Sequence, residues 1–225
     1  MLNVLSAEKM QIIDLLEQFE NPDYEPFYKE YKQHLDNITK ILSKFDLVEG
    51  NVFGHHGTDA TTYPRTEFRS KRRLLSLLAL SKKNILEVGF NAGHSALLLL
   101  TANPDLKYTA IDLNFNPYVI ECFDYLKSVF GDRICLQVGD SQIELPKLLD
   151  KNSSFDGYII DGGHSIPVAQ SDLLNIIKYA GNDAVICFDD SDSPKLRALL
   201  NYHILSGTLF PILDNKDQMF FRLLK

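Results

Sequence analysis

Residues 84–100 read NILEVGFNAGHSALLLL, and this stretch decides the fold expected for the rest of the chain. The short apolar run from Ile85 to Val88 predicts a strand, Gly89 and Gly93 predict a turn, and the apolar residues that follow predict a helix. A strand, a glycine turn and a helix in this order open many nucleoside sites, because glycine lets a ligand approach the backbone. The spacing is E-x-G-x-x-x-G and not the G-x-G-x-x-G of pyrophosphate sites, so a dinucleotide is the weaker interpretation. A turn that binds no ligand is the alternative.

Strand and helix patterns alternate after this unit, which predicts right-handed βαβ units and a parallel sheet. The predicted strands are 84–88, 107–112, 133–138, 156–160 and 183–188, and the predicted helices are 94–102, 117–130, 141–150, 166–180 and 194–205. Two further strand patterns, 208–213 and 218–224, are joined by a short link and predict an antiparallel hairpin. The expected fold is therefore α/β and Rossmann-like, a seven-stranded, mostly parallel sheet with helices on both faces and an antiparallel C-terminal hairpin. A capping box, Ser141 to Glu144, marks one helix start.

The first part of the chain has a different pattern. Residues 7–19 and 24–48 carry apolar groups at helical spacing, and the second stretch is rich in aromatic residues. We expect residues 1–60 to form a helical N-terminal extension and residues 61–225 to form the α/β domain. The extension is interpreted as packing on the core or on a second subunit, as in a homodimer, and a lid over a substrate is the alternative.

The segment between these two parts is rich in glycine and hydroxyl groups, so residues 49–66 are predicted to form a loop. It contains the pair His55-His56, which we interpret as solvated in preference to metal ligands. The helix predicted from Thr66 to Leu80 begins with basic residues, which are Arg65, Arg69, Lys71, Arg72 and Arg73. We interpret them as a solvated helix face, and binding of an anionic substrate or a cofactor carboxylate is the alternative.

Composition narrows the possible partners and location. The 225 residues carry a net charge of −7, which argues against a nucleic-acid partner and favours a small-molecule substrate. The three cysteines, Cys122, Cys135 and Cys187, lie in apolar runs and are predicted to be buried thiols in a reducing compartment, as in a cytoplasmic protein. We see no signal-peptide pattern and no apolar run near the ~20 residues of a membrane span, so no membrane association is expected.

Polar residues follow every predicted parallel strand. Ligands of such sheets bind at the carboxyl ends of the strands, so these residues are expected to converge on one site. Asp112 stands roughly 20 residues past the glycines, where a carboxylate commonly takes ribose hydroxyls. The strand-end residues are Glu87, Gly89, Asn91, Gly93 and Ser95, then Asp112, then Gly139, Asp140, Ser141 and Gln142, then Asp161 to His164, and finally Asp189, Asp190 and Asp192.

The fourth and fifth strands are expected neighbours, which would bring Asp161, Asp189 and Asp190 together. Three adjacent carboxylates repel one another unless they are protonated or bridged by a cation. Oxygen ligands favour Mg²⁺, with Ca²⁺ or Mn²⁺ as further candidates. The alternative is that some of these aspartates cap the helices that follow. His164, three residues after Asp161, is a candidate general base, because imidazole takes up a proton near neutral pH.

Together these motifs resemble class I S-adenosylmethionine-dependent methyltransferases of the metal-dependent small-molecule O-methyltransferase type. The resemblance is carried by EVGFNAGHS at 87–95, AIDLN at 110–114, VGDSQ at 138–142, DGGHS at 161–165 and FDD at 188–190. It implies that Glu87 to Ser95 hold the methionine part of the cofactor and that Asp112 holds the ribose. It further implies that Ser141 and Gln142 lie against the adenine and that Asp161, Asp189 and Asp190 bind the divalent metal. Asp140 is also expected to bind the cofactor. His164 stands where catechol O-methyltransferase-like enzymes often have a lysine base, and is more similar to the macrolide-sugar O-methyltransferases.

The resemblance implies methylation of a hydroxyl on a sugar, a polyketide-type molecule or a catechol, with S-adenosylmethionine and a divalent cation, Mg²⁺ above all, as cofactors. A second hypothesis is a non-catalytic regulatory protein that binds S-adenosylmethionine or another nucleoside. A third is a metal-dependent hydrolase. Retention of His164 with the three aspartates argues against the pure binder, and the glycine turn with Asp112 would lack a purpose in the hydrolase.

Overall fold

The computed structural model describes residues 21, 25–46, 49–54, 64–151 and 154–223. The predicted helix at 7–19 and the pair His55-His56 lie outside these residues. Within the described ranges, no helix combines the length and the apolar character that crossing a bilayer requires.

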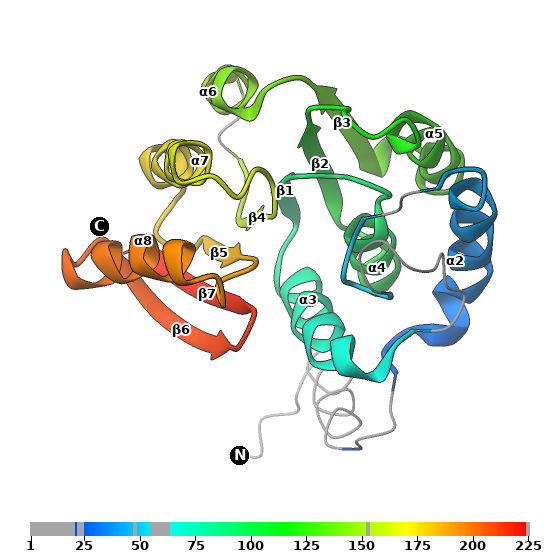
Figure 1. The fold of residues 1–225 in the computed structure, drawn as a ribbon, viewed down its shortest axis with the longest axis horizontal. Coiled ribbons are helices and arrows are strands. Elements are labelled where there is room, and N and C mark those ends of the chain that lie inside the picture. The colour runs from blue at the N-terminus through cyan, green and yellow to red at the C-terminus, as the bar shows by residue number, and fades with distance from the viewer. Residues whose placement is uncertain (1–20, 22–24, 47–48, 55–63, 152–153, 224–225) are drawn as a thin grey trace, which may run out of the picture.

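A seven-stranded sheet forms the centre of the molecule, in the order β3-β2-β1-β4-β5-β7-β6 (Figure 1). The first five strands pair in parallel, whereas β7 runs antiparallel to β5 and β6 antiparallel to β7, which confirms the predicted fold. The strand order reverses between β1 and β4, and ligands of open α/β sheets bind beside such a switch point. The strands are β1 Asn84–Val88, β2 Lys107–Asp112, β3 Ile134–Val138, β4 Gly157–Ile160, β5 Val185–Phe188, β6 Leu209–Asn215 and β7 Gln218–Leu223.

Helices cover both faces of the sheet, and two separate apolar clusters hold them there (Figure 1). One cluster joins the sheet to α2, α3, α4 and α5, and the other joins it to α6, α7 and α8. The helices are α2 Tyr28–Leu42, α3 Arg69–Ser81, α4 His94–Ala102, α5 Val119–Phe130, α6 Ser141–Lys151, α7 Ile166–Tyr179 and α8 Pro194–Leu205. Short 3₁₀ turns, Thr66–Phe68 and Gly131–Arg133, precede α3 and β3.

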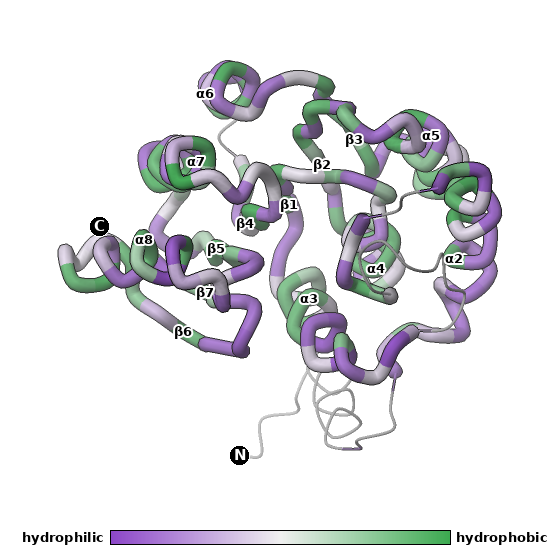
Figure 2. Tube along the Cα trace, viewed as in Figure 1, coloured by the Kyte–Doolittle hydropathy of each residue, from purple (hydrophilic) through white to green (hydrophobic). Residues whose placement is uncertain are grey.

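Helix α2 is shorter than the predicted helix at 24–48. Pro26 precedes it, and the next residue, Phe27, is left-handed at φ 57°, so the helix starts only at Tyr28. Its hydrophilic and hydrophobic residues alternate along the tube in Figure 2, and its buried residues are Tyr31, Leu35, Ile38, Ile41 and Leu42. That apolar face belongs to the same core as α4 and α5. The homodimer contact and the lid stay predictions.

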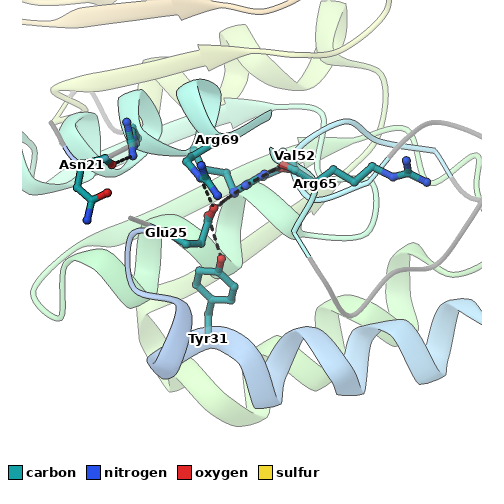
Figure 3. A network of polar contacts seen from close by, with 8 residues as sticks. Asn21, Glu25, Tyr31, Val52, Arg65 and Arg69 are labelled. Atoms are coloured by element: carbon teal, nitrogen blue, oxygen red, sulfur yellow. Dashed lines mark hydrogen bonds and ion pairs between the residues drawn. The ribbon is translucent and has the colours of Figure 1, made fainter. Parts of the chain in front are cut away.

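The basic residues at the start of α3 do not form the solvated face that the sequence predicted. Lys71 is 2% exposed and Arg72 is fully buried. Arg72 forms an ion pair with Glu25, with 2.6 Å between Nη2 and Oε2, and donates to the carbonyl oxygens of Val52 and Arg65 at 2.8 and 2.9 Å. Figure 3 shows this network, in which the Tyr31 hydroxyl also donates to Glu25. The network joins the segment before α2 and the residues around Val52 to α3.

The cysteine prediction is partly wrong. Cys122 and Cys187 are buried and free, as expected, but Cys135 is exposed. Cys135 lies on β3, which is an edge strand of the sheet, so its side chain is not covered as it would be on a central strand.

Candidate active site

A cavity of about 880 Å³ lies at the carboxyl ends of the five parallel strands and is closed on one side by residues 49–52. Its volume is within the range of small-molecule sites. Ten predicted site residues line it: Gly89, Asn91, Ser95, Asp112, Asp140, Ser141, Gln142, Asp161, His164 and Asp190. Three do not line it, namely Glu87, Gly93 and Asp189. The predicted convergence of strand ends on one site is thus present in the structure.

Both glycines of the turn, Gly89 and Gly93, occupy positions where a side chain would clash with neighbouring residues. Gly89 has φ +97°, and a Cβ there would lie 2.1 Å from the carbonyl oxygen of Asp161. The ends of β1 and β4 can approach this closely only because Gly89 has no side chain. Gly93 has φ +73°, and a Cβ would lie 2.6 Å from side-chain atoms of Phe90 and Leu126. Gly93 therefore lets the turn pack against Phe90 and Leu126, and it does not line the cavity.

Glu87 supports the turn from inside the core. It is fully buried, and its carboxylate accepts hydrogen bonds from the Ser95 hydroxyl at 2.7 and 2.8 Å and from the Tyr108 hydroxyl. Burial raises the pKa of Glu87 to about 7. Because Ser95 lines the cavity and Glu87 does not, Glu87 fixes a residue that faces the cavity. Direct contact between Glu87 and a cofactor stays a prediction.

Asp112 holds the same turn from the end of β2. One carboxylate oxygen accepts the backbone N–H groups of Phe90 and Asn91, both at 2.8 Å, and the other accepts that of Asn114 at 2.6 Å. An ionised carboxylate has about four acceptor positions, so it can still bind a ligand hydroxyl. Asn91 offers a second contact, because its Oδ1 is buried in the cavity wall with no partner among the described residues.

Asp140 caps helix α6 from the position before its first residue, so the predicted capping box of Ser141 and Glu144 is wrong. Its Oδ1 accepts the backbone N–H of Gln142 at 2.9 Å, and its carbonyl oxygen accepts that of Glu144 at 2.8 Å. The cap therefore lies one residue before Ser141, because aspartate caps at least as well as serine. The Glu144 carboxylate instead accepts a hydrogen bond from the Lys147 ammonium at 2.8 Å.

A buried carboxylate, Asp172 of α7, lies close behind this part of the cavity. Both of its oxygens are buried, and the Ser141 hydroxyl is their polar neighbour. Burial raises the pKa of Asp172 to about 6, the neighbouring Ser141 hydroxyl lowers it, and Asp140 raises it further. The charged form of Asp172 is therefore disfavoured by burial and is stabilised only in part by the Ser141 hydroxyl.

We expect Asp172→Asn to remove a pH-dependent cost of folding. The folded pKa lies above the unfolded one, so the free energy of unfolding of the wild type should fall as pH rises from about 4 through about 6, by up to about 3 kcal/mol. The free energy of unfolding of the variant should not fall in this way. The variant should therefore become increasingly more stable than the wild type as pH rises from about 4 to about 6. Urea unfolding at several pH values measures it, with Asp132→Asn, an exposed carboxylate, as the control. Parallel pH curves for wild type and Asp172→Asn would contradict the assignment.

Asp161, His164 and Asp190 form an open group on the cavity wall, which we call the cavity cluster. One potential ligand atom from each lies within 4.8 Å of the others. His164 Nε2 lies 2.9 Å from Asp190 Oδ2, and this contact raises the pKa of His164 and lowers that of Asp190. Burial and the charge of Asp189 raise the pKa of Asp161. Oxygen and imidazole donors this close, one of them a destabilised carboxylate, fit a divalent cation.

Asp189 does not line the cavity, but its carboxylate contacts Asp161 of the cavity cluster. It is 3% exposed, and its Oδ2 pairs with the buried Lys71 ammonium at 2.5 Å. Burial raises the pKa of Asp189, the Lys71 ammonium lowers it, and the charge of Asp190 raises it further. Of the three predicted metal ligands, the structure therefore brings Asp161 and Asp190 to the cavity together with His164. A ligand role for Asp189 stays a prediction.

Sequence reasoning did not single out several residues that line the cavity. His94 lines it beside the glycine turn, packs edge-on against Phe53, and is kept neutral because burial lowers its pKa to about 4. Its position inside the EVGFNAGHS motif could have identified His94 as a cavity residue from the sequence. Glu49 and Asn51 line the opposite side, and no local pattern marks them, because a loop shows no periodicity.

Comparisons with known proteins show which proteins the chain resembles. Residues 86–191 match a protein-family model described as a methyltransferase domain. A search of curated protein sequences gave no significant match. The matched stretch is similar to a methyltransferase domain, and the chain has the Rossmann-like methyltransferase fold.

Solved structures resemble the chain at low sequence identity. A proposed O-methyltransferase from Klebsiella pneumoniae has a TM-score of 0.64 at 15% identity, over 95% of this chain and 96% of that chain. CalS11, described as the TDP-rhamnose 3′-O-methyltransferase of calicheamicin biosynthesis, has a TM-score of 0.57 at 17% identity, over 88% of this chain and 95% of that chain. MycE from the mycinamycin biosynthetic pathway, solved with Mg, SAH and mycinamycin VI, has a TM-score of 0.57 at 13% identity, over 83% of this chain and 54% of that chain.

Proposed function

We propose that the protein methylates a hydroxyl group of a small molecule, with S-adenosylmethionine as methyl donor and with help from a divalent cation. The observation that carries the proposal is that one cavity unites the glycine turn, the carboxylate of Asp112 and the cavity cluster of Asp161, His164 and Asp190. The first part suits a nucleoside cofactor, and the second suits an acid–base reaction next to it.

The cofactor would lie along the ends of β1, β2 and β3. Asn91 and Ser95 are placed to contact its methionine part, and Asp112 its ribose. Asp140, Ser141 and Gln142 line the far end of the cavity, where we expect the adenine. The buried, unpartnered Oδ1 of Asn91 supports this placement, because a buried acceptor without a partner is costly unless a ligand donates to it.

The cation would be held by Asp161 and Asp190, with Mg²⁺ favoured by the carboxylate oxygens. When bound, S-adenosylmethionine supplies an electrophilic methyl group, and the cation supplies positive charge that holds the acceptor oxygen and lowers its pKa. His164 then removes the hydroxyl proton while its contact with Asp190 fixes the orientation of the imidazole. An O–CH₃ bond forms as the S–CH₃ bond breaks, and S-adenosylhomocysteine leaves. Alignment of the two reactants in the cavity could supply roughly 7–11 kcal/mol of the barrier reduction.

A sugar hydroxyl is the acceptor class that we favour. Position 164 holds a histidine where lysine is frequent in catechol-type enzymes, and CalS11 is described as a TDP-rhamnose 3′-O-methyltransferase. The test uses S-adenosylmethionine with a labelled methyl group, offered with nucleotide-sugars, macrolide glycosides and catechols, with and without EDTA. A methyl ether formed together with S-adenosylhomocysteine supports the proposal. Cofactor binding without cation binding or transfer would indicate a regulatory binder, and release of free acid or phosphate would indicate a hydrolase.

We expect Asp112→Ala to weaken S-adenosylhomocysteine binding roughly 10- to 100-fold, because a hydrogen bond to a charged group contributes about 1.5–3 kcal/mol. Calorimetry measures the dissociation constant, and circular dichroism checks that the variant is folded. Asp105→Ala, the same change at an exposed carboxylate on the loop before β2, should bind as the wild type does. Equal affinity of all three folded proteins would argue against the ribose assignment.

A further inference from the structure

Asp172 is a buried carboxylate directly behind the cavity wall. It lies in α7, is fully buried, and its Oδ2 is 3.8 Å from the position that a Cβ of Gly162 would take. Helices α6 and α7 lie side by side, so Asp172 also neighbours the hydroxyl of Ser141, the first residue of α6 (Figure 1). Gly162 and Ser141 both line the cavity, and Asp172 does not. Asp172 can therefore act on a ligand only through the residues in front of it.

The carboxylate of Asp172 fixes what the Ser141 hydroxyl can offer to a ligand. An ionised carboxylate can only accept hydrogen bonds, whereas a serine hydroxyl has one proton to donate and two lone pairs to accept with. A buried carboxylate without a donor is costly, so the Ser141 proton is directed to Asp172. Burial raises the pKa of Asp172 and the Ser141 hydroxyl lowers it, as a donor to the charged form does. The oxygen of Ser141 then presents lone pairs, and no proton, to the cavity.

We propose that Asp172 is a positioning residue that fixes the Ser141 hydroxyl as an acceptor, so that this end of the cavity selects a base with an amino group at position 6. The inference rests on the proposed function, in which the adenine lies at Ser141 and Gln142. Adenine carries a donor at that position, its 6-amino group, whereas hypoxanthine carries a carbonyl oxygen there, as guanine does.

A carbonyl oxygen at position 6 is disfavoured in either orientation of the Ser141 hydroxyl. With the proton on the side of Asp172, two acceptor oxygens face each other. With the proton turned to the ligand, the buried carboxylate loses its donor. Gln142 does not supply the same selectivity, because a side-chain amide can turn either its donor or its acceptor to the ligand.

The test is calorimetric binding of two probes, S-adenosylhomocysteine and S-inosylhomocysteine, by the full chain at a pH well above 6, where Asp172 is charged. The wild type should bind S-adenosylhomocysteine roughly 10- to 100-fold more tightly, because an opposed or unpaired polar group in a closed site costs that much affinity. Asp172→Asn should reduce this ratio roughly 10-fold, since an amide can donate to the hydroxyl oxygen and release the Ser141 proton. Asp132→Asn, at an exposed carboxylate, is the control and should keep the wild-type ratio.

The ratio of the two dissociation constants separates positioning from a merely structural role. If Asp172 only supports the fold, Asp172→Asn weakens both probes equally and leaves the ratio unchanged, which would overturn the inference. Ser141→Ala removes the hydroxyl and should reduce the ratio as Asp172→Asn does. The double variant Asp172→Asn/Ser141→Ala should reduce it no further, because Asp172 acts through that hydroxyl, and additive reductions would also overturn the inference.

Failure of the inference is distinguishable from failure of the proposed function. A wild type that binds both probes equally, or a Ser141→Ala variant that keeps the full ratio, overturns the inference even if Asp172→Asn does not fold. The cofactor part of the proposed function stands in both cases. A wild type that binds neither probe overturns the cofactor assignment and the inference together.

Discussion

Replacing His164 with alanine is expected to slow methyl transfer about 10²- to 10⁴-fold while S-adenosylhomocysteine affinity stays unchanged. The side chain of His164 is 58% exposed in the cavity, and Asp190 orients it through a contact of 2.9 Å. A base that acts on the acceptor hydroxyl contributes to the transition state and not to cofactor binding. The measurements are single-turnover transfer rates with the acceptor that the labelled assay identifies, and calorimetry with S-adenosylhomocysteine.

His164→Gln is the matched control for this prediction. Glutamine can keep a hydrogen bond to Asp190 but cannot take up a proton near neutral pH, so its rate should fall as far as that of the alanine variant. Mn²⁺ affinity separates the two roles open to the imidazole. If His164 is a base, both variants should retain Mn²⁺ binding; if it is a ligand in the cavity cluster, binding and rate should fall together. Full turnover by His164→Ala would eliminate the base assignment.

The sequence was sufficient to predict the sheet, because periodicity marks buried strands strongly. Strands β1 and β2 have the predicted bounds, and β3, β4 and β5 begin within two residues of the expected positions. The polar strand ends followed from the same reasoning, since parallel strands place their carboxyl ends at one edge. For that reason Asp112, Asp161 and His164 were found to line the cavity that the sequence had implied.

The interior charges could not be predicted in this way. Lys71 and its partner Asp189 are 118 residues apart in the chain, and Arg72 and Glu25 are 47 residues apart. A pattern read along one helix shows only that a position is polar, and most polar helix positions are solvated. Burial of such a residue is decided by a distant partner, which periodicity does not reveal. Residues 49–52 were missed as a cavity wall for the same reason, because tertiary contacts through Arg72 and Lys71 place them there.

Arg72→Met is expected to lower the free energy of unfolding by about 3–5 kcal/mol, because it leaves the Glu25 carboxylate without its closest partner. The guanidinium group is fully buried and also satisfies the carbonyl oxygens of Val52 and Arg65, so three segments lose their common contact (Figure 3). Methionine has a similar length and fills the space, so the loss measures the charge and its hydrogen bonds. Urea unfolding followed by fluorescence and circular dichroism gives the free energy, and a constant m-value shows that the unfolding transition is comparable.

Arg69→Met provides the comparison on the same helix and with the same partner. Its Nε lies 3.4 Å from Glu25, and its side chain is 21% exposed, so we expect a loss below about 1 kcal/mol. The double variant Glu25→Gln/Arg72→Met removes both charges and should recover part of the loss, because the penalty of Arg72→Met comes largely from the carboxylate left unpaired. A loss for Arg72→Met as small as that for Arg69→Met would mean that the buried pair does not hold α3 against residues 49–52. In that case the position of Asn51 beside Lys71 would need another support, and the cavity wall would depend on Lys71 alone.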